Sequence, residues 1–112
     1  MTRLLRAALL PASFFILLLA FAPARADETE ATAGKAIYAE RCELCHGRRA
    51  NQRALGVSKV LIRVPDTEIL AKLRAYQETP PSPDAAMKDK MKSGLAETDI
   101  EGLRAYIHTL RP

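Results

Sequence analysis

The feature that most constrains this chain is the heptapeptide Arg41–Gly47, which reads Arg-Cys-Glu-Leu-Cys-His-Gly. Cys42, Cys45 and His46 form a C-x-x-C-H pattern, which is typical of covalent haem attachment. Thiols at this spacing lie about one helical turn apart, so they can add to the two vinyl groups on one edge of a porphyrin. His46 follows directly and is predicted to bind the iron as its proximal ligand. Gly47 would let the chain turn sharply away from the macrocycle.

Three other roles for the two cysteines fit the sequence less well. A thioredoxin-like dithiol opens a helix after a strand, and no strand pattern precedes Cys42. A zinc site would need both His46 and the distant His108, a spacing that matches no common zinc finger. A disulfide between Cys42 and Cys45 would close almost no loop, so it would stabilise the fold little. The motif therefore favours haem attachment.

The N-terminal segment 1–26 is predicted to be a cleaved secretory signal peptide. Two arginines precede an apolar run at 7–22, and an A-x-A cleavage site follows at 24–26. The alternative is an uncleaved membrane anchor. The apolar run is shorter than the roughly 20 residues that span a bilayer comfortably, and Pro11 interrupts it. Cleavage is therefore the better interpretation.

Cleavage after Ala26 would leave residues 27–112 as a single domain in the periplasm. The formal net charge of +4 would fall close to neutral, because three arginines and no acidic residue leave with the signal. We expect no nucleic-acid partner and no stable membrane insertion after cleavage. A domain this small is marginally stable without an additional stabilising element, and an apolar haem at its centre would supply one.

Helical spacing dominates the mature chain. A polar segment at 27–32 is expected to be frayed, and apolar residues then recur every three or four positions from Ala33 into Cys42. A second helical pattern follows Asp66, which is a plausible N-cap. A third helix is predicted from about Glu97 to Leu110, with acidic residues in its first turns, as the helix dipole favours.

Two connecting segments and two glycines complete this pattern. The short apolar run at 60–64 has no second strand to pair with, so it is interpreted as an extended segment that lines the haem. The proline-rich stretch 77–86 is predicted to be an exposed loop. Gly34 and Gly102 each lie within a predicted helix, where glycine costs about 1 kcal/mol relative to alanine. A close approach of another helix would explain them; simple tolerance is the alternative for Gly34.

Taken together, these residues resemble the class I c-type cytochromes in their short bacterial single-haem form. The resemblance rests on Gly34, Ile37 and Tyr38 ahead of the haem motif, on a methionine after the proline-rich loop, and on the pattern from Leu95 to Tyr106. It implies an all-α cytochrome c fold, with three to five short helices wrapped around one covalently bound haem c. It also implies that the N-terminal helix crosses the C-terminal one at near right angles.

The same resemblance implies a methionine as the sixth ligand of the haem iron. Met87 directly follows the proline-rich loop, about where the family carries this ligand. Met91 lies one helical turn later and shares a face with Leu95, a spacing that more often indicates core packing. Met87 is therefore the predicted ligand, with Met91 as the alternative. His108 falls in the last turn of the final helix and is expected to be exposed there.

The sequence departs from the family in two places. The family usually has Pro-x-Leu after the haem motif, and the proline carbonyl accepts a hydrogen bond from the axial imidazole. The counterpart here is Lys59–Val60–Leu61, so another backbone carbonyl must orient His46. The family also tends to begin its last helix with Ser or Thr, where this chain has Ala96. Thr98 is then a candidate cap.

The predicted function is electron transfer by a monohaem cytochrome whose iron cycles between Fe(II) and Fe(III). The sequence offers no nucleophile or acid–base pair, so we expect a carrier rather than an enzyme. The alternative is the electron-accepting cytochrome subunit of a periplasmic oxidoreductase complex. A haem sensor with an open iron site is a third possibility, against which the methionines argue.

Basic residues gather on both sides of the predicted haem in sequence. They comprise Arg41, Arg48, Arg49, Arg53, Lys59 and Arg63 near the motif, and Lys88, Lys90 and Lys92 near the methionines. If these residues form a basic rim around the exposed edge of the haem, that rim would suit a redox partner with an acidic docking surface. The alternative is a mixed, solvated surface.

Overall fold

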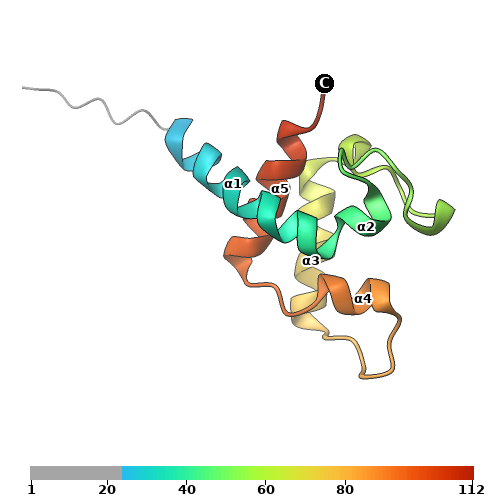
Figure 1. The fold of residues 1–112 in the computed structure, drawn as a ribbon. Coiled ribbons are helices and arrows are strands. Elements are labelled where there is room, and N and C mark those ends of the chain that lie inside the picture. Colours follow the sequence, from blue (N-terminus) through green and yellow to red (C-terminus); the bar gives the residue numbers. More distant parts are fainter. Residues whose placement is uncertain (1–23) are drawn as a thin grey trace, which may run out of the picture.

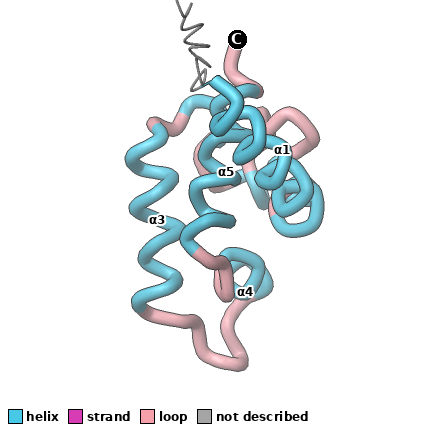
Figure 2. Tube along the Cα trace, turned by 90° about the vertical axis from the view of Figure 1, so that its left-hand side faces the viewer, coloured by secondary structure: helices cyan, strands magenta, loops and turns pink. Residues whose placement is uncertain are grey.

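Figure 1 shows the fold in a computed structural model of the chain, which describes residues 24–112. The predicted signal peptide falls largely on residues 1–23, which lie outside this described part. The helices, with two short 3-10 segments marked η, are α1 (Ala24–Arg41), α2 (Glu43–His46), η1 (Ala54–Gly56), η2 (Leu61–Arg63), α3 (Asp66–Glu78), α4 (Met87–Lys92) and α5 (Glu97–Thr109). Figure 2 shows helices and loops but no strand in residues 24–112, which confirms the predicted all-α class.

Helices α1 and α5 cross in direct backbone contact (Figure 1). A Cβ added to Gly34 would lie 1.8 Å from the carbonyl oxygen of Gly102, and one added to Gly102 would lie 3.2 Å from the Cα of Gly34. Neither position has room for a side chain without a shift of backbone. The close approach predicted for both glycines is thus confirmed, and it outweighs their unfavourable helix propensity.

Aromatic and aliphatic side chains seal this crossing. The ring of Tyr38 lies 5.4 Å from that of Tyr106 between centroids, and only 1% of Tyr38 is exposed. Helix α5 contributes the predicted apolar stripe, of which Ile100, Leu103 and Ile107 are buried. The core therefore sits where α5 meets α1 and α3, and Figure 2 shows α5 between those two helices.

The start of α3 is joined to the end of α5 by charged groups. The carboxylate of Asp66 forms an ion pair with the guanidinium of Arg111, with an N–O distance of 2.8 Å. Its other oxygen lies 3.1 Å from Nδ1 of His108. The helix begins at Asp66 itself, with Pro65 in the N-cap position. The N-cap role predicted for Asp66 is therefore wrong. Its carboxylate faces Arg111 and His108 instead, at and just beyond the last turn of α5.

Three further local predictions are wrong. Residues 27–32 are helical within α1 rather than frayed, as Ala31, the two glutamates and the acidic residue in the first turn favour. Residues 61–63 form the 3-10 segment η2, although Val60 and Val64 on either side are extended as predicted. Thr98 does not cap α5; instead Asp99 accepts a hydrogen bond from the backbone N–H of Ala96 at 2.9 Å.

None of the helices in residues 24–112 combines the length and the apolar character needed to cross a membrane.

Candidate functional site

The three residues of the C-x-x-C-H motif occupy one continuous turn. Helix α1 ends at Arg41 and α2 begins at Glu43, so Cys42 alone separates them. The N–H of Cys42 donates to the Tyr38 carbonyl at 2.9 Å, and the N–H of His46 donates to the Cys42 carbonyl, also at 2.9 Å. The turn is thus held by α1, and α1 is itself fixed against α5.

Gly47 ends this turn in a conformation that favours glycine. Its φ is +82°, and an added Cβ would lie 2.9 Å from the side chain of Gln52. The N–H of Gln52 donates to the His46 carbonyl at 3.0 Å, which folds the following loop back against the motif. The sharp turn predicted at Gly47 is therefore confirmed.

Tyr38 locks the end of the motif to α1. Its hydroxyl donates a hydrogen bond to the Gly47 carbonyl at 2.6 Å. Burial is the main reason that the pKa of Tyr38 lies well above its ordinary value, so the hydroxyl keeps its proton and its donor role. The sequence placed Tyr38 in the helix ahead of the motif, as part of the family pattern, and predicted no bond to Gly47. This bond spans nine residues through a turn whose path helical periodicity does not specify.

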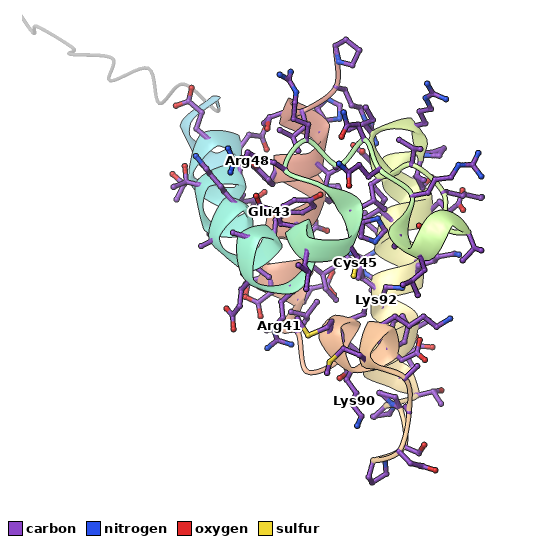
Figure 3. All side chains as sticks on the ribbon, turned by 45° about the vertical axis from the view of Figure 1, so that its right-hand side comes forward. Arg41, Glu43, Cys45, Arg48, Lys90 and Lys92 are labelled. Atoms are coloured by element: carbon purple, nitrogen blue, oxygen red, sulfur yellow. The ribbon has the colours of Figure 1, made fainter. Side chains whose placement is uncertain are left out.

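Both cysteines are free thiols, but their surroundings differ. Cys42 is half-buried, and burial raises its pKa to about 11 although the positive charges of Lys92 and Arg41 act in the opposite direction. Cys45 is exposed, and Figure 3 shows its sulfur pointing from α2 toward α4. One thiol therefore lies against the fold while the other faces outward.

His46 is buried, with 9% of its surface exposed. Burial lowers its pKa, and the charge of Lys92 lowers it further. At neutral pH the ring is consequently uncharged, which is the form that binds metals. Its Nδ1 is buried and has no hydrogen-bond partner among the residues that the structure describes. A buried ring nitrogen left in this way costs about 1–3 kcal/mol, which a small shift toward a backbone carbonyl would offset.

The backbone carbonyl that the sequence requires to orient His46 is not in hydrogen-bonding position. The backbone of Gln52 is the group that acts toward a higher pKa of the His46 ring, against burial and Lys92. No hydrogen bond to Nδ1 is formed, however. Gln52 is therefore the candidate for the orienting carbonyl, reachable by a small adjustment of the loop after Gly47.

Both candidate methionines lie on α4. Met87 is its first residue, with 70% of its surface exposed, whereas Met91 is half-buried. Two long-range bonds hold this short helix: the Tyr76 hydroxyl from α3 donates to Asp89 at 2.8 Å, and Arg41 donates to the Ser93 carbonyl at 3.4 Å. The structure thus places both thioethers on an element joined to α3 and to the end of α1, and neither is singled out.

Large apolar side chains are exposed around this region. They are Leu44 in α2, Leu55 and Val57 in and after η1, and Met87 in α4, all exposed by 70% or more. A neutral imidazole and a thioether are ligands that suit haem iron rather than hard cations, and two free thiols can form thioether bonds to the vinyl groups of the haem. The residues present therefore fit a covalently held haem, whose apolar body would cover side chains that the polypeptide leaves exposed.

Other potential sites lie elsewhere or are absent. His108 is exposed and contacts Asp66, as expected for a helix-terminal histidine. Within residues 24–112, no cluster of three His, Cys, Asp or Glu side chains is placed to hold a metal ion. One cavity of about 730 Å³, which the sequence gave no sign of, opens between the end of α3, the proline-rich loop and residues 93–96. Neither cysteine, His46 nor either methionine lines it.

A family model described as "Cytochrome c" matches residues 31–111, which is well over half of the chain. The match begins within α1 and extends past the end of α5. A search of the curated proteins found no match. A search of the solved structures found none either.

Proposed function

Because the chain belongs to the cytochrome c family, we propose that it is a periplasmic monohaem electron carrier in which Cys42 and Cys45 hold the haem. The family binds haem c covalently and transfers electrons through its iron, which supplies a one-electron Fe(II)/Fe(III) couple. The observation that carries the proposal is the C-x-x-C-H turn. It combines two free thiols with a buried, uncharged imidazole whose Nδ1 has no partner within residues 24–112.

Each residue of the site has a distinct role in this proposal. Cys42 and Cys45 form the two thioether bonds, and His46 is the proximal ligand. Met87 is the distal ligand, with Met91 as the alternative on the same helix. His/Met ligation raises the reduction potential relative to ligation by two nitrogen atoms, and full coordination keeps small molecules off the metal.

The periplasmic location rests on the predicted signal peptide, with cleavage after Ala26. Cleavage would remove the first three residues of α1 and leave its contact with α5 at Gly34 intact.

The partner is proposed to carry an acidic docking surface. Figure 3 shows Arg48 above Cys45 and Arg41, Lys90 and Lys92 below it, so positive side chains lie on both sides of this cysteine. The acidic Glu43 is paired with Arg48 at 3.3 Å. An excess of positive charge around the exposed edge of the site would steer an acidic partner and raise the encounter rate. Electron transfer to the native partner should slow with rising salt, and more steeply than in the Lys88→Glu/Lys90→Glu variant.

The decisive experiment is the intact mass of the protein purified from the periplasm. We expect residues 27–112 plus one haem, and acid–acetone extraction should leave the haem on the chain. The Cys42→Ser/Cys45→Ser variant is the matched control and should release its haem. Freely extractable haem in the unchanged protein would overturn the proposal.

The sixth ligand is tested by two matched substitutions on α4. Met87→Ala should abolish the weak long-wavelength absorption typical of iron–thioether ligation. Met91→Ala should keep that band and lower stability. The reverse pattern would assign the ligand to Met91.

A further inference from the structure

Lys92 differs from the two other lysines of α4. Lys88 and Lys90 are exposed, whereas Lys92 is half-buried. Its Nζ lies 5.6 Å from the centroid of the Tyr76 ring on α3, in the range of a cation–π contact. Figure 3 shows Lys92 on the side of α4 that faces Cys45, while Lys90 lies on the opposite side of the helix, away from Cys45. The ammonium group is thus held at a defined place rather than in bulk solvent.

Lys92 lies close enough to the C-x-x-C-H motif for its charge to act on the side chains of Cys42 and His46. No carboxylate pairs with Lys92 among the ion pairs of the described residues. The carboxylate of Asp89 instead accepts the hydrogen bond of the Tyr76 hydroxyl.

We propose that Lys92, held against Tyr76 and facing the C-x-x-C-H turn, raises the reduction potential of the haem iron. This inference rests on the proposed function. Loss of one electron to the partner adds one positive charge at the iron, and a nearby fixed cation disfavours that change. Because Lys92 is partly buried, salt screens its effect less than it screens the effect of an exposed lysine. Lys92 thereby favours the reduced form.

The test is the midpoint potential of the haem-loaded protein, measured by spectroelectrochemistry. Lys92→Gln removes the charge and keeps much of the side-chain length. The equilibrium constant for oxidation by a reference couple should rise about tenfold, which corresponds to a potential lower by about 59 mV for one electron. Lys92→Arg keeps the charge and should return the potential to within about a quarter of that shift.

Lys90→Gln is the matched control, because it removes the same charge from the same helix at an exposed position. Its shift should be less than about a third of the Lys92→Gln shift and should vanish at about 0.5 M salt, where the Debye length is short. The Lys92→Gln shift should persist at that salt concentration. Equal shifts for the two glutamine variants, or an arginine variant that behaves like the glutamine variant, would overturn the proposal.

Two further readouts separate a charge effect from a structural one. The long-wavelength thioether band and the thermal unfolding midpoint should be the same in Lys92→Gln as in the unchanged protein. If the band is lost, a change of ligand causes the shift, and the role assigned to Lys92 is wrong. Covalent haem in every variant with unchanged potentials would refute the Lys92 proposal alone, whereas extractable haem would refute the proposed function itself.

Discussion

The crossing of α1 and α5 and the face formed by α2, η1 and α4 differ in how far the polypeptide completes them. At the crossing, Gly34 and Gly102 bring two backbones into contact, and Tyr38 and Leu103 are each 1% exposed. On the other face, Leu55 is 76% exposed. Nδ1 of His46 lacks a hydrogen-bond partner there within the described part of the chain. One region is closed by its own side chains, and the other presents the surface that a bound group would cover.

This difference indicates a division of the core in so short a chain. Its own side chains build one part, and a bound group would complete the other. A domain of this size buries a modest fraction of its surface, so it is marginal without an additional source of stability. The crossing holds α1 in place, and α1 positions the C-x-x-C-H turn. The haem bound to that turn would then supply the apolar body for the second half of the core. The following predictions, from the largest expected effect to the smallest, test this division.

Removal of the haem should have the largest effect. The Cys42→Ser/Cys45→Ser variant without haem should lose the amide-exchange protection of α4 and of the loop after Gly47. The amides at the crossing of α1 and α5 should keep the most protection, because that contact needs no bound group. Hydrogen exchange followed by mass spectrometry measures both regions, with the haem-loaded protein as the control. Equal loss in both regions would show that the crossing also depends on the haem.

Substitution at the crossing should be the next largest effect. Gly34→Ala places a Cβ 1.8 Å from the Gly102 carbonyl oxygen, so α1 and α5 must separate. We expect the free energy of unfolding of the haem-loaded protein to fall by about 3 kcal/mol or more, as overpacking of a close contact does. Chemical denaturation followed by circular dichroism measures it.

The matched control for that substitution is Ala36→Gly, at an exposed position on the same helix. It should cost about 1 kcal/mol through helix propensity. Alanine is the better helix former of the two residues, so propensity alone would make Gly34→Ala stabilising. A stabilised Gly34→Ala variant would therefore show that the crossing can relax.

Loss of the Tyr38 hydroxyl should have a smaller effect, at the junction of the two regions. Tyr38→Phe keeps the buried ring and leaves the Gly47 carbonyl without its 2.6 Å hydrogen bond. We expect a loss of about 1–3 kcal/mol in the free energy of unfolding. Because this bond joins α1 to the end of the C-x-x-C-H turn, the exchange protection of residues 47–52 should fall more than that of α5. An equal loss of exchange protection in residues 47–52 and in α5 would show that the substitution perturbs the core instead.

The crossing of α1 and α5 could be predicted from the sequence more fully than the face formed by α2, η1 and α4. Glycines at 34 and 102 and the apolar stripe of α5 follow from helical periodicity, which depends on local spacing. The C-x-x-C-H turn is also local. The role of Asp66 was not predictable in this way, because its pairing with Arg111 depends on two helix ends meeting in space. The contact between Lys92 and Tyr76 has the same origin. The sequence favours Met87 over Met91 as the distal ligand, but both lie on α4 one turn apart, and the structure singles out neither.

The smallest predicted effect concerns the ion pair between α3 and α5, which should change how the stability of the protein depends on pH. Arg74 on α3 donates to Glu97 on α5 at 2.9 Å, and this hydrogen bond lowers the pKa of Glu97 from its ordinary value of 4.5. A carboxylate with a lowered pKa stabilises the fold above its unfolded-state pKa, and that contribution is lost as the pH falls through the lowered value. Arg74→Gln should therefore reduce the unfolding temperature slightly at neutral pH, since the pair is exposed and screened by solvent.

The difference between Arg74→Gln and the unchanged protein should narrow as the pH falls below 4.5, where Glu97 becomes protonated in the unfolded state and then in the folded one. Thermal unfolding between neutral pH and about pH 2 measures this trend. Lys35→Gln is the control, because it removes one positive charge from an exposed position of α1. The difference in unfolding temperature between Lys35→Gln and the unchanged protein should follow the net charge of the whole molecule instead. A difference for Arg74→Gln that is constant over the whole range would show that the ion pair between α3 and α5 contributes nothing to the stability of the closed region.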